Sequence, residues 1–167
     1  MMELVIAVCG GDKVGKSSII KSFFGQDYMP DHAVQYKYIG SKDLVHIYVE
    51  KFRSSLSNPD GCIFVYDITS LDSFSTMCDK YRDVGRMFRQ NKIVFGNKTD
   101  LDITRRISQI EVDDWTREKG LKHLVGNSYE KSTIDEAFYR LIQDIILGTG
   151  DQYLADRFRN FVTRTRC

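Results

Sequence analysis

The feature that most limits the fold of this chain is a glycine-rich loop close to the N-terminus. Residues 10–17 read GGDKVGKS and fit the pattern G-x-x-x-x-G-K-[ST] at every defined position. An apolar run at residues 4–9 comes before the loop. After it, Ile19, Ile20, Phe23 and Phe24 recur at helical spacing. A buried strand, a glycine loop and a helix in this order are typical of a phosphate-binding loop at the start of an α/β domain.

The residue types in this loop suit the chemistry of phosphate binding. Glycines allow backbone N–H groups to turn inward around phosphate oxygens, and the start of the following helix adds a partial positive charge. Lys16 is expected to reach the β- and γ-phosphates, and the Ser17 hydroxyl to ligate Mg²⁺. An accidental glycine-rich turn is the alternative, which the strand and helix on either side disfavour. The predicted phosphate-binding residues are Gly10, Asp12, Lys13, Val14, Gly15, Lys16, Ser17 and Ser18, with Ser17 as the metal ligand.

Apolar periodicity extends the alternation of strands and helices along the chain. It predicts a hairpin from residues 34–39 and 44–49, and helices at 74–88, 108–120 and 134–146. Ser108 and Glu111 form a capping-box pattern at the start of the third of the four expected helices. Short strands are predicted at 62–68, 92–95 and 123–125. The expected fold is therefore an α/β P-loop NTPase, a six-stranded and mostly parallel sheet flanked by helices, with one antiparallel hairpin strand.

Length and composition favour one ordinary domain with a short extension. The chain has 167 residues, with 24 Lys+Arg against 23 Asp+Glu, so its charge does not suggest a nucleic-acid partner. No apolar run approaches the roughly 18 residues of a membrane span, and Glu3 with the early glycines interrupts any signal peptide. The cysteines form no CxxC pair or Cys/His cluster, which favours reduced thiols over zinc or disulfides. We expect a cytoplasmic monomer.

The C-terminal segment has a character of its own. Residues 1–150 are expected to form the domain, and residues 151–167 a basic helical extension with arginines around apolar residues. This extension could be a solvated helix end, a contact for a partner or a segment that associates with membranes. Cys167 ends the chain without a C-a-a-X signal, so lipidation stays open.

A second motif selects the base. Residues 97–100 read NKTD and follow directly after an expected strand. The carboxylate of Asp100 can accept two hydrogen bonds from guanine, a pair that adenine does not offer. Lys98 can lie over the ring, and Asn97 can tie this segment to residues 10–17. A turn or capping cluster is the alternative, and the preceding phosphate loop makes it the weaker one.

With these two motifs in this order, the chain resembles the Ras superfamily of small GTPases, most closely its Ras and Rab branches, over residues 3–147. Residues 66–69 with 73–74, and residues 135–138, also match the family. The resemblance implies GTP or GDP with Mg²⁺ as ligands, and protein effectors or regulators as partners. Under it, Tyr28 and the segment from Ser128 join the base site. The guanine-binding residues that it implies are Tyr28, Asn97, Lys98, Asp100, Ser128 and Tyr129.

The chain departs from the family where hydrolysis is carried out. No threonine precedes Thr69, and only Gln35 lies near the place of the first switch threonine. The Asp-x-x-Gly segment is replaced by residues 49–53, VEKFR, and no glutamine occurs from residue 36 to 89. The second switch is shorter than in the family. Glu50 could act on Mg²⁺ through water, which stays open. No catalytic residue is identified.

Two further departures concern the binding loops. Asp12 stands where Ras proteins prefer glycine and places like charge beside the γ-phosphate. Tyr129 and Glu130 replace a small residue and a lysine of the third guanine loop, where the Tyr129 N–H could still meet guanine O6. We therefore expect an atypical small GTPase that binds nucleotide, hydrolyses GTP slowly or not at all, and acts by recruiting partners.

Alternatives remain. The chain could be a pseudo-GTPase, an interaction module that no longer depends on nucleotide. A P-loop kinase of another class is disfavoured by the motif at residues 97–100. The spacing of His32, His46 and His123 suggests no oriented partner for a catalytic imidazole, and Trp115 is expected to be a packing residue.

Overall fold

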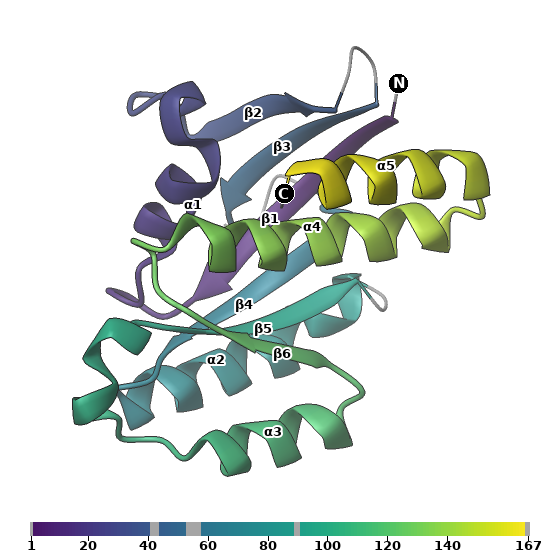
Figure 1. The fold of residues 1–167 in the computed structure, drawn as a ribbon. Helices are drawn as coiled ribbons and strands as arrows, with labels where there is room; N and C mark the ends of the chain where they lie inside the picture. The colour runs from purple at the N-terminus through teal and green to yellow at the C-terminus, as the bar shows by residue number, and fades with distance from the viewer. Residues whose placement is uncertain (1, 41–43, 53–57, 89–90, 166–167) are drawn as a thin grey trace.

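The computed structural model describes residues 2–40, 44–52, 58–88 and 91–165. Its centre is a six-stranded sheet in the order β2-β3-β1-β4-β5-β6 (Figure 1). Only β2 runs antiparallel to its neighbour β3, and the other neighbours are parallel. The predicted fold class is confirmed. The strands are β1 (Met2–Gly10), β2 (Val34–Ile39), β3 (Val45–Lys51), β4 (Gly61–Asp67), β5 (Lys92–Asn97) and β6 (Lys122–Val125).

Helices cover both faces of the sheet because the strands are apolar on both sides. One core lies between the sheet and the pair α1 and α4, where the rings of Phe23 and Phe138 stack at 3.9 Å. The other core lies under α2 and α3 and contains Met77 and Val112. Figure 1 shows α4 crossing one face while α2 and α3 lie on the other. The helices are α1 (Lys16–Phe24), α2 (Leu71–Val84), α3 (Gln109–Glu118), α4 (Lys131–Gly148) and α5 (Gln152–Thr165).

The C-terminal segment folds back as α5 and runs alongside α4 (Figure 1). Gly150 makes the turn with a φ of 79°, and Asp151 accepts a hydrogen bond from the Leu154 N–H at the start of the helix. Ala155 and Phe158 are fully buried in the same core as α1 and α4. The apolar side of α5 is therefore part of the domain's packing, while its arginines lie on the exposed side.

Helix α3 begins where the sequence predicts, but without the predicted capping box. Ser108 is its N-cap residue, and its side chain makes no capping hydrogen bond. Ser108 is exposed, so water can satisfy the first N–H groups of the helix instead. A side-chain cap is present on α2, where Ser70 Oγ accepts from the Ser73 N–H at 3.1 Å.

The expectations about cysteines, metal clusters and membrane spans can be compared with the residues that the structure describes. Cys9, Cys62 and Cys78 carry free thiols. Across the described ranges, no three His, Cys, Asp or Glu side chains are grouped as a metal site requires. No helix in those ranges is long and apolar enough to cross a bilayer. Three parts of the chain lie outside the described residues: Arg166, Cys167 and residues 53–57, where the sequence predicts a shortened second switch.

Candidate functional site

The candidate site lies where β1, β4 and β5 end, at one edge of the sheet. These strands are parallel neighbours, so their carboxyl ends, at Gly10, Asp67 and Asn97, meet there. Strand β1 has β3 on one side and β4 on the other, which makes its end the point where the strand order reverses. Ligands of open α/β sheets bind at such a point.

The loop after β1 has no room for side chains at two of its glycines. A Cβ on Gly10 would lie 2.4 Å from the carbonyl oxygen of Val65, and one on Gly15 would lie 2.3 Å from Asn97 Nδ2. Gly15 also has a φ of 99°, in the left-handed region that favours glycine. Lys13 adopts a positive φ of 60°. The loop therefore turns tightly into α1 with its backbone close to neighbouring strands.

Lys16, the first residue of α1, lies across this loop. Its Nζ donates hydrogen bonds to the carbonyls of Gly10, at 3.0 Å, and Gly11. Partial burial lowers the pKa of Lys16, and the carboxylate of Asp12 opposes that shift. The hydroxyls of Ser17 and Ser18 are exposed on the first turn of α1, and within the described residues neither forms a hydrogen bond. Their oxygens are thus open to a ligand.

Asn97 ties three loops together. It is 1% exposed, and its Nδ2 donates to the carbonyl of Val14 at 2.9 Å and to Ser128 Oγ at 3.0 Å. The predicted contact between Asn97 and the loop of residues 10–17 is present. One buried amide therefore sets the distance between the phosphate loop, the segment after β5 and the segment after β6.

Lys98 makes a second cross-link at the same edge. Its Nζ lies 2.9 Å from the carbonyl of Lys13 and 2.5 Å from Asp67 Oδ2, and its backbone has a φ of 74°. Asp67 also accepts from the N–H and hydroxyl of Thr69. Burial raises the pKa of Asp67, but the hydrogen bonds from Lys98 and Thr69 outweigh it and leave this pKa below its usual value.

Asp67 was not among the residues predicted for the site. The signal in the sequence was a carboxylate that ends a fully apolar strand, next in the chain to the strand ended by Asn97. Parallel neighbours bring such residues to one edge. Without the strand order, however, nothing placed Asp67 beside Lys98 rather than elsewhere along the sheet.

The remaining residues predicted for the base site differ in how far their side chains are exposed to solvent. Asp100 is exposed, and its carboxylate has no hydrogen bond among the described residues. Tyr129 is 89% exposed, and its N–H donates to Asn127 Oδ1 at 2.9 Å, so this N–H already has an acceptor. Tyr28 is half-buried and packs against the core under α1 and α4.

Gln35 is engaged away from the phosphate loop. Its side chain is 2% exposed, accepts from the Met29 N–H at 2.7 Å and donates to the carbonyls of Met29 and His32 at 2.7 and 2.8 Å. Both ends of the amide are therefore used to close the loop before β2. The sequence indicated only that Gln35 stands near the place of a family threonine.

The imidazole of His123 has side-chain partners that the sequence did not suggest. The sequence suggested no oriented partner for this imidazole, and that was wrong, because its Nδ1 lies 2.6 Å from Asp113 and its Nε2 lies 3.0 Å from the Tyr66 hydroxyl. Burial lowers the pKa of His123, against the raising effect of Asp113. These side chains connect β4, α3 and β6. Spacing missed the contact because the three elements meet only in the folded chain.

Comparisons with known proteins agree with this geometry. The model of the Ras family matches residues 46–147. The Ras-related protein RABC1 of Arabidopsis thaliana is 30% identical over 161 residues, which cover 84% of this chain and 76% of that protein. The Ras-related protein Rab-1C of Dictyostelium discoideum is 30% identical over 163 residues, covering 86% and 81%. Ras-like protein 1 of Saccharomyces cerevisiae is 28% identical over 170 residues, covering 90% and 55%.

Proposed function

This chain belongs to the Ras family, and we propose that it binds GTP or GDP at the edge of β1, β4 and β5 and hydrolyses GTP slowly or not at all. The observation that carries the proposal is the amide of Asn97. It holds the phosphate loop through Val14 and the segment after β6 through Ser128. A buried amide with such partners keeps the two halves of a nucleotide site at a constant separation.

The phosphate half of the site is supported by the backbone of residues 10–15 and by the start of α1. Only glycine fits at residues 10 and 15, against the Val65 carbonyl and the Asn97 amide, and the backbone N–H groups of so tight a turn can bind phosphate oxygens. Lys16, desolvated and already directed across the loop, would exchange carbonyl partners for phosphate oxygens. Residues 12–14 and 18 would complete this half of the site.

Mg²⁺, when bound, would neutralise charge on the phosphates. The exposed hydroxyl of Ser17 fits as a direct ligand, and the ordinary preference of Mg²⁺ for phosphate oxygens and water supplies the rest. Glu50, half-buried on β3 beside Ala7 of β1, is proposed to act only through water.

The base half of the site is proposed around the open carboxylate of Asp100. Lys98 is anchored at its ammonium by Lys13 and Asp67, which leaves its carbon chain to lie along a flat ring. Because the Tyr129 N–H already donates to Asn127, a contact to guanine O6 would require it to change or share its acceptor. We expect guanine binding to be weaker for this reason.

The expectation of slow hydrolysis rests on which side chains could position an attacking water. Phosphoryl transfer needs a phosphate cradle, Mg²⁺ and a positioned water. The amide of Gln35 is committed to Met29 and His32 on both of its ends. No other glutamine precedes residue 90 except Gln26. We infer that the protein acts chiefly by recruiting protein partners rather than by turnover.

The alternative, an interaction module that does not depend on nucleotide, is favoured by one observation. Lys16 finds acceptors within its own loop, at Gly10 and Gly11, so the loop does not need a ligand to satisfy this ammonium. Nucleotide that stays bound through purification would distinguish a nucleotide-binding protein from a module that does not depend on nucleotide.

The test is to denature the purified protein and identify the released nucleotide by chromatography. Lys16→Ala should lose the nucleotide, whereas Lys21→Ala, an exposed lysine of the same helix, should keep it. Guanine nucleotide that disappears only with Lys16→Ala supports the proposal. A protein that is purified empty and does not bind added GTP would contradict it, and released ADP or ATP would indicate a different base specificity.

Hydrolysis is tested separately by single-turnover measurement with radiolabelled GTP on the loaded protein. We expect release of phosphate to be slower than the intrinsic rate of Ras, about 3–5 × 10⁻⁴ s⁻¹, because the switch threonine and glutamine are missing here. A rate equal to or above that of Ras would show that the chain positions a water by other residues.

A further inference from the structure

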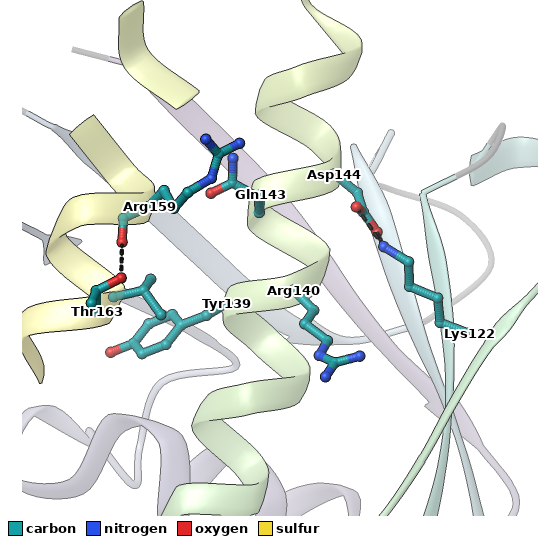
Figure 2. A pocket seen from close by; sticks show the side chains of 8 residues that line it. Lys122, Tyr139, Arg140, Gln143, Asp144, Arg159 and Thr163 are labelled. Atoms are coloured by element: carbon teal, nitrogen blue, oxygen red, sulfur yellow. Dashed lines mark hydrogen bonds and ion pairs between the residues drawn. The ribbon is translucent and has the colours of Figure 1, made fainter. Parts of the chain in front are cut away.

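Two hollows lie on the helical faces away from the nucleotide edge, and their charges differ. The hollow between α4 and α5, of about 370 Å³, is shown in Figure 2. Each of its cations has an acid within 3.2 Å: Lys122 pairs with Asp144, Arg140 with Glu136, and Arg159 with Asp156. Its charges are matched internally, so it offers little to a charged ligand.

The hollow between the end of α2 and α3 has unmatched positive charge. It measures about 460 Å³, and four cations line it. Arg82 is paired with Asp79, and Lys119 lies 3.1 Å from Glu118. In the described part of the chain, Arg86 and Lys92 have no acidic side chain within ion-pair distance. We call this hollow the α2–α3 groove.

Lys92 is the more buried of the two unmatched cations. Its Nζ donates one hydrogen bond, to the carbonyl of Gly85 at 3.1 Å, and an ammonium has two further N–H donors. Burial lowers the pKa of Lys92, which means that its charge is less well solvated than that of a surface lysine. An anion in the groove would restore part of the solvation that Lys92 has lost.

Aromatic rings form the wall beside these cations. Trp115 packs edge-on against Tyr81 at 5.3 Å and against Phe74 at 5.8 Å, so its indole is held from two sides while part of it stays exposed. Burial raises the pKa of the neighbouring Cys78 thiol to about 11, so this group is uncharged at neutral pH and does not repel an anion. The groove therefore combines a held flat ring, with the Lys119 Nζ 5.5 Å from its centroid, with two cations that have no acidic partner among the described residues.

We propose that the α2–α3 groove binds an acidic segment of a partner protein, with a carboxylate at Arg86 and Lys92 and an aromatic or apolar side chain against Trp115. Cation and ring lie side by side here, and a peptide in which an aromatic residue stands next to Asp or Glu presents a carboxylate and a ring together. The proposal concerns a surface outside the nucleotide edge and does not rest on nucleotide binding.

The same features disfavour a membrane or a nucleic acid as the occupant. Asp79 and Glu118 stand beside the groove and are exposed, so they oppose a broad anionic surface. The net charge of the chain is +1, too small to draw a polyanion. A short peptide needs to contact only Arg86, Lys92 and Trp115, and the acids beside the groove are already paired with Arg82 and Lys119.

Trp115 supplies the measurement because it is the one tryptophan of the chain. Its fluorescence is followed while the full protein is titrated with the acetylated, amidated tripeptide Glu-Phe-Glu. We expect a saturable change, and binding weaker by at least about tenfold for the neutral tripeptide Gln-Phe-Gln, since charge-assisted hydrogen bonds are lost. Equal affinity for the two peptides, or no saturable change, would overturn the proposal.

Variants locate the site. Arg86→Gln combined with Lys92→Gln should weaken Glu-Phe-Glu binding at least about tenfold. Lys122→Gln combined with Arg140→Gln removes the same charge from the other hollow and should leave binding unchanged. Equal weakening by both pairs would indicate nonspecific charge attraction and overturn the site.

Two further arms complete the design. Arg86→Gln alone tests the groove if the double variant does not fold, because Arg86 is exposed and has no described hydrogen bond; it should still weaken the acidic peptide. Phenyl phosphate is titrated in parallel. Saturable binding of phenyl phosphate without binding of Glu-Phe-Glu would overturn the acidic peptide in favour of a small phosphate ester.

Discussion

Gly15 is the position at which the structure makes its sharpest prediction about the nucleotide edge. Replacing it with alanine introduces a Cβ 2.3 Å from Asn97 Nδ2, at a residue whose φ is 99°. The clash is with an amide whose two hydrogen bonds, to Val14 and Ser128, join three loops. The smallest possible side chain should therefore loosen the whole edge.

The magnitude can be worked from these contacts. A left-handed backbone costs an L-residue roughly 1–2 kcal/mol. Displacing Asn97 loses two hydrogen bonds of about 0.5–1.5 kcal/mol each. The reduced freedom of the unfolded chain returns about 0.4–1 kcal/mol. We expect Gly15→Ala to lower the free energy of unfolding by about 2–4 kcal/mol, which for a domain of this size is a fall of roughly 5–15 °C in Tm.

Urea unfolding followed by circular dichroism measures this, with the slope of the transition expected to stay constant. Gly120→Ala is the matched control, because Gly120 has a φ of 67° and nothing within 4 Å of its added Cβ. Gly120→Ala carries only the cost of a left-handed backbone, so its free energy of unfolding should fall by about 1 kcal/mol or less. The difference between the variants isolates the contact with Asn97.

A double variant decides whether the reasoning is right. With Asn97→Ala already present, the obstructing amide is gone, and adding Gly15→Ala should then cost no more than Gly120→Ala does. Non-additivity of about 1–3 kcal/mol is expected for residues in direct contact. If Gly15→Ala costs the same with and without Asn97, the contact does not determine the stability of this edge.

Three other changes test separate parts of the molecule. Lys98→Ala should raise the pKa of Asp67, because it removes a hydrogen-bonded ammonium; carboxyl NMR titration measures this, and an unchanged pKa would contradict the contact. Burial holds the pKa of His123 below its unfolded value of 6.5, so stability should fall as pH is lowered from about 7 to 5, and urea unfolding should show that His123→Gln reduces this dependence. Phe158→Ala should cost about 3–5 kcal/mol in the same assay, against nearly nothing for exposed Arg164→Ala, and equal effects would mean that α5 does not stabilise the domain.

The sequence predicted the elements of the fold because each one carries its own periodicity. The stripe of α4, from Ile134 to Ile146, is buried as predicted, and the hairpin of β2 and β3 lies where alternation placed it. The boundary at Ser108 was also predicted, but the capping hydrogen bond expected from its hydroxyl is not formed. Local signals of this kind depend on neighbours in the chain, so one sequence is enough to read them.

The motifs of the candidate site were predicted, and so was one connection, from Asn97 to the phosphate loop, but the other connections were missed. Residues 10–17 and 97–100 each contain a recognisable spacing, and Asn97 was expected at the phosphate loop. The salt bridge between Asp67 and Lys98 was not predicted, nor was the hydrogen bond from Asn97 to Ser128, and each joins residues 31 apart. No periodicity connects residues so far apart, since only the strand order brings them to one edge.

The amino-acid sequence by itself determined the glycine loop, the alternation of strand and helix, and the missing threonine and glutamine that argue for slow hydrolysis. The tertiary structure alone decided which charges are matched. It pairs the cations between α4 and α5 with acids, and among the residues that the structure describes it gives Arg86 and Lys92, beside Trp115, no acidic partner. The physical reason is that electrostatic and packing energies depend on distances between side chains, which the chain acquires only on folding.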